Sequence, residues 1–225
     1  MYRAFLSIPK TVPCRDGDFV EWHNGISHYG FWAVVVKDPA WIALCDGARE
    51  HVKAFVHPGY QRAPHITVIA CGLFDGNHFS AEQLNRQKAA LSEMRISPFH
   101  LVAGPLNSFT TGPYLTVEDR AGTISRIRDR LAMISAEDTP VRYEPHITLG
   151  LYRDAFDTAE VADCLAGFTW EPVGPMLAAD LSFCLYETKK VQGRFDIIEG
   201  VKLNAHVTRS RETRYPAHNR YHLKV

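Results

Sequence analysis

Hydrophobic and polar positions along this chain alternate between short strand-like runs and longer helix-like runs. Residues 29–36 read YGFWAVVV, a β-branched and aromatic run that predicts a buried strand. Asp38 and Pro39 supply an N-cap and a first-turn proline for a helix expected to run to about Val56. Residues 65–72 form the next apolar run and predict a second strand. The pattern therefore predicts a strand–helix–strand unit.

The rest of the chain continues this order of elements and then repeats it. Ser80 and Gln83 form a capping box for a helix that is expected to end near Met94. The other predicted elements are, in chain order, strands at 99–109 and 114–118, a helix around 124–134, a strand at 146–152, a helix at 157–168, and strands at 177–187 and 195–203. No linker divides the sequence, so we expect one domain over residues 1–225, with an N-terminal extension at 1–28 and a basic C-terminal tail at 205–225.

A strand–helix unit used twice predicts an α+β fold. We expect duplicated units that form two facing antiparallel sheets, with the helices outside and a central cleft between the lobes of a bilobal molecule. The length of 225 residues fits a single domain of this kind.

The charge of the chain is balanced, with 25 basic and 25 acidic residues. A protein that binds a long duplex usually carries a broad basic surface, because neutralising the phosphate backbone supplies most of its affinity. The balance therefore favours a small anionic ligand or the end of a nucleic acid. The tail beyond His206 is the local exception, and it is either a solvated segment or a contact for RNA phosphates.

Cysteine usage and hydropathy indicate the compartment. The five cysteines are odd in number, scattered, and without a Cys-x-x-Cys pair, so we expect neither a disulfide framework nor a zinc knuckle. No apolar run approaches the roughly 20 residues that span a bilayer, and the first nine residues do not resemble a secretory signal. We therefore expect a reduced cytoplasmic protein with no membrane contact, and we expect it to be a monomer.

One four-residue motif, Pro-His-Ile-Thr, occurs twice, and each copy begins an apolar run. Because a strand reverses side-chain direction at every residue, each histidine shares a face with the threonine two positions later, about 7 Å along the strand. If the two strands face each other, His65, Thr67, His146 and Thr148 surround one small cavity. Such a cavity would hold a single phosphate-sized group.

Two imidazoles and two hydroxyls suit metal-free acid–base chemistry on a phosphodiester. Near neutral pH, one of His65 and His146 can take a proton from an attacking water while the other gives one to the departing ribose oxygen, as opening a 2′,3′-cyclic phosphate requires. The Thr67 and Thr148 hydroxyls can donate to the non-bridging oxygens, where charge must be stabilised in the transition state. The sequence leaves open which histidine is the base.

A metal site is the competing chemistry. Zinc requires about three converging protein ligands, and the chain has no His-Glu-x-x-His, no paired cysteines and no P-loop-type glycine-rich loop. We therefore expect neither a metal nor a cofactor. A single His-x-Thr is weak evidence for a site, as the third copy at 206–208 illustrates. The two longer copies differ because the proline, the isoleucine and the following apolar residues also recur.

With the motifs at 65–68 and 146–149 in a duplicated layout, the chain resembles the 2H phosphoesterase superfamily. That superfamily includes 2′-5′ RNA ligase-like proteins and 2′,3′-cyclic nucleotide phosphodiesterases. The resemblance covers about residues 29–203 and implies a bilobal fold, the four motif residues in a central cleft, and metal-free hydrolysis of cyclic phosphodiesters. Residues 11–28 depart from the familiar layout and are expected to cap or edge the cleft.

Two more positions are similar to the cyclic phosphodiesterase branch, which carries a tryptophan in its first strand and an aromatic residue beyond its second motif. Trp32 fits the first position. Counting in twos from His146 places Tyr152 on the same face if the strand is unbroken. Trp32 and Tyr152 would then clasp a base, unless both are core residues. Cys71 occupies the corresponding place after the first motif, and we expect a small lining residue rather than a nucleophile.

The expected function is hydrolysis of a 2′,3′-cyclic phosphate on a nucleotide or an RNA 3′ end. Action on 2′-5′ linkages, as a hydrolase or a ligase, and action on ADP-ribose 1″,2″-cyclic phosphate stay open, because neither the motifs nor the aromatic residues separate these leaving groups. A non-catalytic nucleotide- or RNA-end-binding module is the alternative of another class. Two complete His/Thr pairs argue against it, since binding alone needs no acid–base pair.

Overall fold

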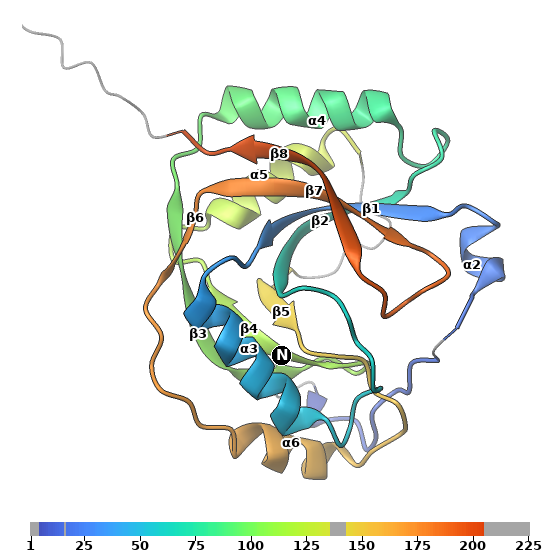
Figure 1. The fold of residues 1–225 in the computed structure, drawn as a ribbon, viewed down its shortest axis with the longest axis vertical. Helices are drawn as coiled ribbons and strands as arrows, with labels where there is room; N and C mark the ends of the chain where they lie inside the picture. The colour runs from blue at the N-terminus through green and yellow to red at the C-terminus, as the bar shows by residue number, and fades with distance from the viewer. Residues whose placement is uncertain (1–4, 16, 136–142, 205–225) are drawn as a thin grey trace, which may run out of the picture.

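The computed structural model describes residues 5–15, 17–135 and 143–204 (Figure 1). Its strands form one curled sheet in the order β6-β3-β4-β5-β2-β1-β7-β8, and every paired neighbour is antiparallel. The strands are β1 (His28–Val35), β2 (His65–Leu73), β3 (Phe99–Ser108), β4 (Pro113–Glu118), β5 (His146–Thr148), β6 (Met176–Ala178), β7 (Asp180–Glu187) and β8 (Phe195–Lys202). The helices of the described residues are α2 (Val20–His23), α3 (Pro39–Val52), α4 (Ala81–Met94), α5 (Thr123–Ala132) and α6 (Thr158–Ala166).

The sheet has two four-stranded lobes that meet at the β2–β5 pair. One lobe holds β2, β1, β7 and β8, and the other holds β5, β4, β3 and β6. Helices α4 and α5 pack on the first lobe, against β8 and β2, while α3 and α6 pack on the second, against β4 and β3 (Figure 1). The predicted α+β class with outer helices is confirmed, and the two lobes are continuous through the strands that carry the two motifs.

Local capping explains where the two long helices begin. The Asp38 side chain accepts hydrogen bonds from the backbone N–H groups of Ala40, at 2.8 Å, and Trp41, at 3.2 Å, ahead of α3. At α4, Ser80 and Gln83 form the predicted capping box. Helix α3 ends at Val52, a few residues before the expected end.

The second motif strand is shorter than predicted. β5 ends at Thr148 instead of continuing to residue 152. Beyond Thr148 the chain lies close to the residues ahead of β4, and a Cβ on Gly112 would lie 2.3 Å from the carbonyl oxygen of Gly150. Tyr152 then forms an isolated bridge with Val56. The backbone N–H groups of Leu149 and Tyr152 still donate to the carbonyls of Pro113, at 3.0 Å, and Thr111, at 2.9 Å, so this stretch stays beside the segment ahead of β4 without forming a regular ladder.

The N-terminal segment lies across the loops of the second lobe. The backbone N–H of Val12 donates to the carbonyl of Thr110, and that of Cys14 donates to the carbonyl of Tyr152, both at 2.8 Å. The segment then forms α2, which lies next to the start of β1 (Figure 1). The basic tail at 205–225 lies outside the described residues.

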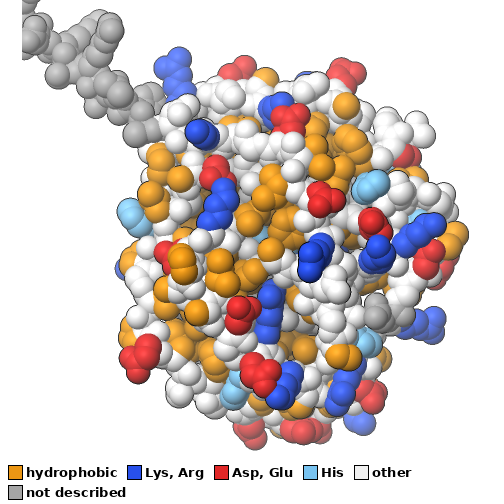
Figure 2. Space-filling model, viewed as in Figure 1, with side chains coloured by type: hydrophobic (Ala, Val, Ile, Leu, Met, Phe, Trp, Pro, Cys, Tyr) orange, Lys and Arg blue, Asp and Glu red, His pale blue; other side chains and the backbone are white. Residues whose placement is uncertain are grey.

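The surface carries both charge signs. Figure 2 shows basic and acidic side chains interspersed over the face in view. This agrees with the balanced composition of 25 basic and 25 acidic residues. Within the described ranges, the helices are all too short or too polar to span a bilayer.

Candidate active site

The two motifs lie on neighbouring strands at the junction of the lobes. Ile66 of β2 pairs with Ile147 of β5, and both side chains are fully buried. Residues on either side of such a pair point to the opposite face of the sheet. The histidine and the threonine of each motif therefore share the face that is turned away from these two isoleucines.

The register also fixes how the four polar side chains are arranged. Continued by one residue in each direction, it places His65 opposite Thr148 and Thr67 opposite His146. The two histidines are then diagonal neighbours, with backbones about 7–8 Å apart. The predicted convergence of the four motif residues thus follows from a single pair of adjacent strands.

Both histidine rings are held by the same kind of hydrogen bond. Nδ1 of His65 lies 2.8 Å from the carbonyl oxygen of Ala63, and Nδ1 of His146 lies 2.7 Å from the carbonyl oxygen of Glu144. A carbonyl oxygen can only accept, so Nδ1 carries the proton in each ring. In both motifs Nε2 is therefore the nitrogen that exchanges a proton with a ligand.

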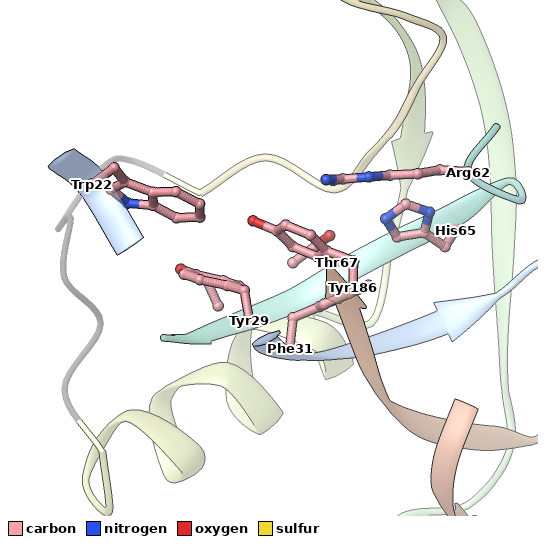
Figure 3. Close-up of a pocket in the computed structure, with 8 residues that line it drawn as sticks. Trp22, Tyr29, Phe31, Arg62, His65, Thr67 and Tyr186 are labelled. Atoms are coloured by element: carbon pink, nitrogen blue, oxygen red, sulfur yellow. The ribbon is translucent and has the colours of Figure 1, made fainter. Parts of the chain in front are cut away.

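A pocket of about 350 Å³ opens beside the first motif. Its lining residues are Trp22, Tyr29, Phe31, Arg62, His65, Thr67, Ala70 and Tyr186. In Figure 3, Trp22 and Tyr29 lie at one end of the pocket and His65 and Arg62 at the other. The second motif adjoins this pocket through the pairing of β5 with β2 and is not among its lining residues.

Arg62 places a positive charge in the pocket. Its guanidinium carbon lies 4.1 Å from the ring centroid of Tyr186, and its Nη2 donates a 2.8 Å hydrogen bond to the carbonyl of Val191. Its Nε is buried and has no hydrogen-bond partner among the described residues. Within the same part of the chain, no carboxylate lies within ion-pair distance of Arg62. This charge therefore suits an anionic ligand.

Aromatic side chains form the wall between the pocket ends. The rings of Tyr29 and Tyr186 stack with centroids 5.3 Å apart, and Trp22 lies 5.7 Å from Tyr29. His65 itself lies between Phe31, at 5.4 Å, and Phe195, at 4.9 Å. A flat apolar wall next to a cation suits a nucleobase with an attached phosphate.

The two histidines differ in their electrostatic surroundings. The pKa of His65 is lowered to about 4, chiefly by burial and in part by the charges of Arg62, His146 and Arg49, against the opposing effect of the hydrogen bond to the Ala63 carbonyl. Burial also lowers the pKa of His146, but its hydrogen bond to the Glu144 carbonyl and the charge of that carboxylate act in the opposite direction. His65 is therefore neutral at pH 7. Of the two histidines, only His146 has a nearby carboxylate that raises its pKa.

The sequence profile of the 2′-5′ RNA ligase superfamily matches residues 36–187, which is more than half of the chain and includes both motifs. The chain belongs to this superfamily. The predicted resemblance to 2H phosphoesterases is thereby confirmed. No curated protein sequence matches the chain.

Solved structures share the fold of this superfamily member at low sequence identity. Escherichia coli LigT complexed with 3′-AMP superposes with a TM-score of 0.55 and 16% identity, over 80% of this chain and 99% of LigT. The apo form of LigT gives a TM-score of 0.53 with the same identity and coverage. A structure described as a phosphoesterase gives a TM-score of 0.51, again at 16% identity, over 80% of this chain and 99% of the phosphoesterase chain. These likenesses support the fold, while the site rests on the register and side-chain geometry of β2 and β5.

Trp32 does not line the pocket of this superfamily member, so the prediction that it clasps a base is wrong. Its side chain is 0% exposed, and its Nε1 donates a 2.8 Å hydrogen bond to Oε1 of Gln87 on α4. Ala33 pairs with Thr67, so the odd-numbered residues of β1 face the motif side. Tyr29 and Phe31 therefore occupy the pocket face that sequence reasoning gave to Trp32.

Tyr152 is also a core residue, and its predicted stacking role is wrong. It is 0% exposed, and its hydroxyl lies 2.5 Å from Oγ of Ser108. The prediction extended the alternation of β5 past Thr148, where the strand ends. An alternation argument holds only while the ladder continues.

A β-bulge moves Cys71 away from the pocket as well. Trp32 pairs with Ile69 and Ala33 with Thr67, so the intervening Val68 has no partner on β1. The extra residue reverses the alternation of the residues after it, so Ala70 lines the pocket. Cys71 is buried instead, and burial raises the pKa of its thiol to about 12.

Sequence reasoning missed the pocket residues Arg62, Tyr29, Phe31, Trp22 and Tyr186. Arg62 stands three residues before His65, and this short spacing was an available signal. The others depend on strand register and on the path of the N-terminal segment. Among the described residues, no three His, Cys, Asp or Glu side chains are grouped so that they could hold a metal ion.

Proposed function

We propose that this protein hydrolyses 2′,3′-cyclic phosphodiesters on nucleotides or RNA 3′ ends, with His65 and His146 as its acid–base pair. The observation that carries the proposal is the β2–β5 register, which brings both motifs to one face of the sheet beside a cationic pocket. Membership of the superfamily supports it. LigT, which shares the fold, has been crystallised with 3′-AMP, ATP and NADP+, in agreement with a nucleotide ligand.

In this proposal His65 is the base and His146 is the acid. His65 is neutral at pH 7, so its Nε2 can take a proton from the attacking water. The charge of Glu144 favours a proton on His146, and the bound phosphodiester anion favours it further. The water oxygen forms a bond to phosphorus while Nε2 of His146 gives its proton to the ribose oxygen whose bond to phosphorus breaks. The product is a phosphomonoester next to a free hydroxyl.

Three groups stabilise the phosphoryl oxygens in this scheme. The hydroxyls of Thr67 and Thr148 lie on the same face as the histidines and can donate to the non-bridging oxygens. Arg62 adds a positive charge that no described carboxylate neutralises. Donors aimed at oxygens that gain charge lower the barrier by about 3–4 kcal/mol each in comparable sites.

A second candidate is cleavage or ligation of 2′-5′ linkages. The name of the matched superfamily, 2′-5′ RNA ligase, favours it. The same proton transfers would serve, but the leaving group would be a second nucleoside instead of an oxygen of the reacting ribose.

One incubation experiment tests the proposal and separates the candidates. The purified protein is mixed with the four 2′,3′-cyclic mononucleotides, a 2′-5′ dinucleotide and RNA ending in a cyclic phosphate, with and without EDTA, and the products are identified by mass and chromatography. We expect cyclic phosphates to be opened to monoesters at a rate that EDTA does not change. Tight binding without conversion would establish a binding module, and a rate lost to EDTA and restored by zinc would establish metal-dependent hydrolysis.

A further inference from the structure

A second pocket of about 470 Å³ adjoins the catalytic one. Trp22 and Tyr186 line both pockets, so the two share a wall. The volume lies in the range of small-ligand sites, about 300–1,000 Å³. A ligand that leaves the catalytic pocket past Trp22 therefore enters a second cavity.

The lining of the second pocket combines flat apolar groups with two charged side chains. Phe19, Trp22 and Tyr186 supply aromatic rings, Leu151 and Val191 supply aliphatic surface, and Arg15 and Glu21 supply one charge of each sign. Trp22 is 42% exposed, which is unusual for a tryptophan that has no ligand to cover it. Aromatic faces beside basic side chains are the groups that bind nucleobases of any sequence.

Arg62 lies at the boundary between the two pockets. Its guanidinium lies over the ring of Tyr186, and both pockets share that ring. The same guanidinium donates a hydrogen bond to the carbonyl of Val191, a residue that lines the second pocket. Its buried Nε has no partner among the described residues. A phosphodiester that joins a nucleoside in one pocket to a nucleoside in the other would pass this unneutralised charge.

The wall that forms the second pocket is held in place before any ligand binds. Nε2 of His57 donates to the carbonyl of Cys14 at 2.5 Å, next to Arg15. The fully buried His23 bonds Oδ1 of Asp18 at 2.5 Å through Nε2 and accepts from the N–H of Gly25 at 3.0 Å through Nδ1. Arg15, Phe19 and Trp22 lie outside residues 36–187, so the match to the superfamily profile does not include this part of the pocket.

We propose that the second pocket binds the base of a second nucleoside, joined by a phosphodiester to the nucleoside that reacts. This inference rests on the proposed function and names its substrate class as oligonucleotides rather than free mononucleotides. The second nucleoside is either the 5′ neighbour in an RNA that ends in a cyclic phosphate or the leaving group of a 2′-5′ dinucleotide.

The test compares substrates that have the same reacting nucleoside. kcat/KM is measured for cytidine 2′,3′-cyclic phosphate, for the dinucleotide ApC with a terminal 2′,3′-cyclic phosphate, and for 2′-5′-linked ApC. The variants are Phe19→Ala and Arg15→Glu, which line only the second pocket. Arg86→Glu makes the same charge change on the exposed outer side of α4 and is the matched control. Thermal unfolding checks that Phe19→Ala remains folded.

We expect the wild type to act on the cyclic dinucleotide about tenfold or more better than on the mononucleotide, since stacking one base is worth about 1–3 kcal/mol. Phe19→Ala and Arg15→Glu should lose most of this preference and keep the mononucleotide rate, while Arg86→Glu should keep both. A preference for 2′-5′-linked ApC that the same variants abolish would identify the second nucleoside as the leaving group. Equal action on the mononucleotide and both dinucleotides would overturn the inference and leave the proposed function intact.

A binding titration separates failure of the inference from failure of the proposed function. The quenching of tryptophan fluorescence is followed as cytidine 3′-phosphate or ApC 3′-phosphate is added, because Trp22 is exposed, Trp32 and Trp41 are fully buried, and the half-buried Trp170 is stacked on Phe168 and lines neither pocket. We expect the dinucleotide to bind about tenfold more tightly to the wild type and to lose that advantage with Phe19→Ala. If no substrate is converted, the proposed function fails, and equal affinities would then overturn the second-pocket inference as well.

Discussion

Ile66 and Ile147 face each other across β2 and β5, and each stands between the histidine and the threonine of its own motif. An antiparallel pair has local twofold symmetry, so rotation about this pair exchanges one motif with the other. The two imidazoles consequently lie at equivalent positions on either side of the pair, with a threonine opposite each. A reaction that needs a base on one side of a phosphorus atom and an acid on the other fits this symmetry.

Replacing either histidine should abolish most of the turnover. For His65→Gln and for His146→Gln we expect kcat on a cyclic mononucleotide to fall about 10²–10⁴-fold, because each removes one proton-transfer group. The midpoint of thermal unfolding should change little, since glutamine keeps much of the volume. His100→Gln, at an exposed position of β3, is the matched control. Full activity of either motif variant would rule out the acid–base pair.

Removing the charge of Arg62 should weaken catalysis while leaving the fold intact. Arg62→Met keeps a long side chain over Tyr186 but loses the donors and the charge, so we expect kcat/KM to fall about 10²-fold. Arg62→Lys should recover part of the loss, because it restores the charge without the planar fork. Arg86→Met, on the exposed side of α4, should have no effect in the same steady-state assay. Equal losses in Arg62→Lys and Arg62→Met would show that the shape of the side chain, and not its charge, is what matters.

The pH dependence of kcat/KM depends on the two lowered histidine pKa values. In the proposed mechanism the active form has His65 neutral and His146 protonated, so activity should fall below the pKa of His65, about 4, and above the pKa of His146, which lies below its usual 6.5. The optimum of the free enzyme should therefore lie on the acid side of pH 6.5. In Arg62→Met the pKa of His65 should rise, because a nearby positive charge is gone, and the acid limb should move to higher pH. A wild-type optimum near pH 8 would contradict the proposed assignment.

Those features that depend on local chemistry could be predicted from the sequence. The N-cap at Asp38, the capping box at Ser80 and the apolar run after Pro64 each act within a few residues, and the structure has α3, α4 and β2 where they indicate. The repeated Pro-His-Ile-Thr motif identified the two motif strands, because a histidine and a threonine two residues apart share a face in any strand. The pairing of those strands needed the structure.

The errors came from strand irregularities, strand pairing and long-range contacts, which no local sequence pattern reports. The bulge at Val68 reverses the side of the strand on which Ala70 and Cys71 lie, and nothing in the apolar run marks it. The face of Trp32 depends on its pairing with β2, because an alternating pattern fixes which residues share a face but not which face is the site. The pocket wall at Trp22 depends on a segment whose path is fixed by hydrogen bonds to distant loops.

The contrast between Trp32 and Tyr29 separates core packing from ligand contact. Trp32→Phe removes the hydrogen bond to Gln87 and leaves a buried amide oxygen poorly satisfied, so we expect the free energy of unfolding to fall by about 1–3 kcal/mol, with KM unchanged. Tyr29→Ala removes part of the pocket wall and should raise KM for a cyclic nucleotide about 5–50-fold with a smaller effect on kcat. Urea unfolding and steady-state kinetics on the same preparations check both. A raised KM in Trp32→Phe together with a normal KM in Tyr29→Ala would reverse the assignment and return the base-stacking role to Trp32.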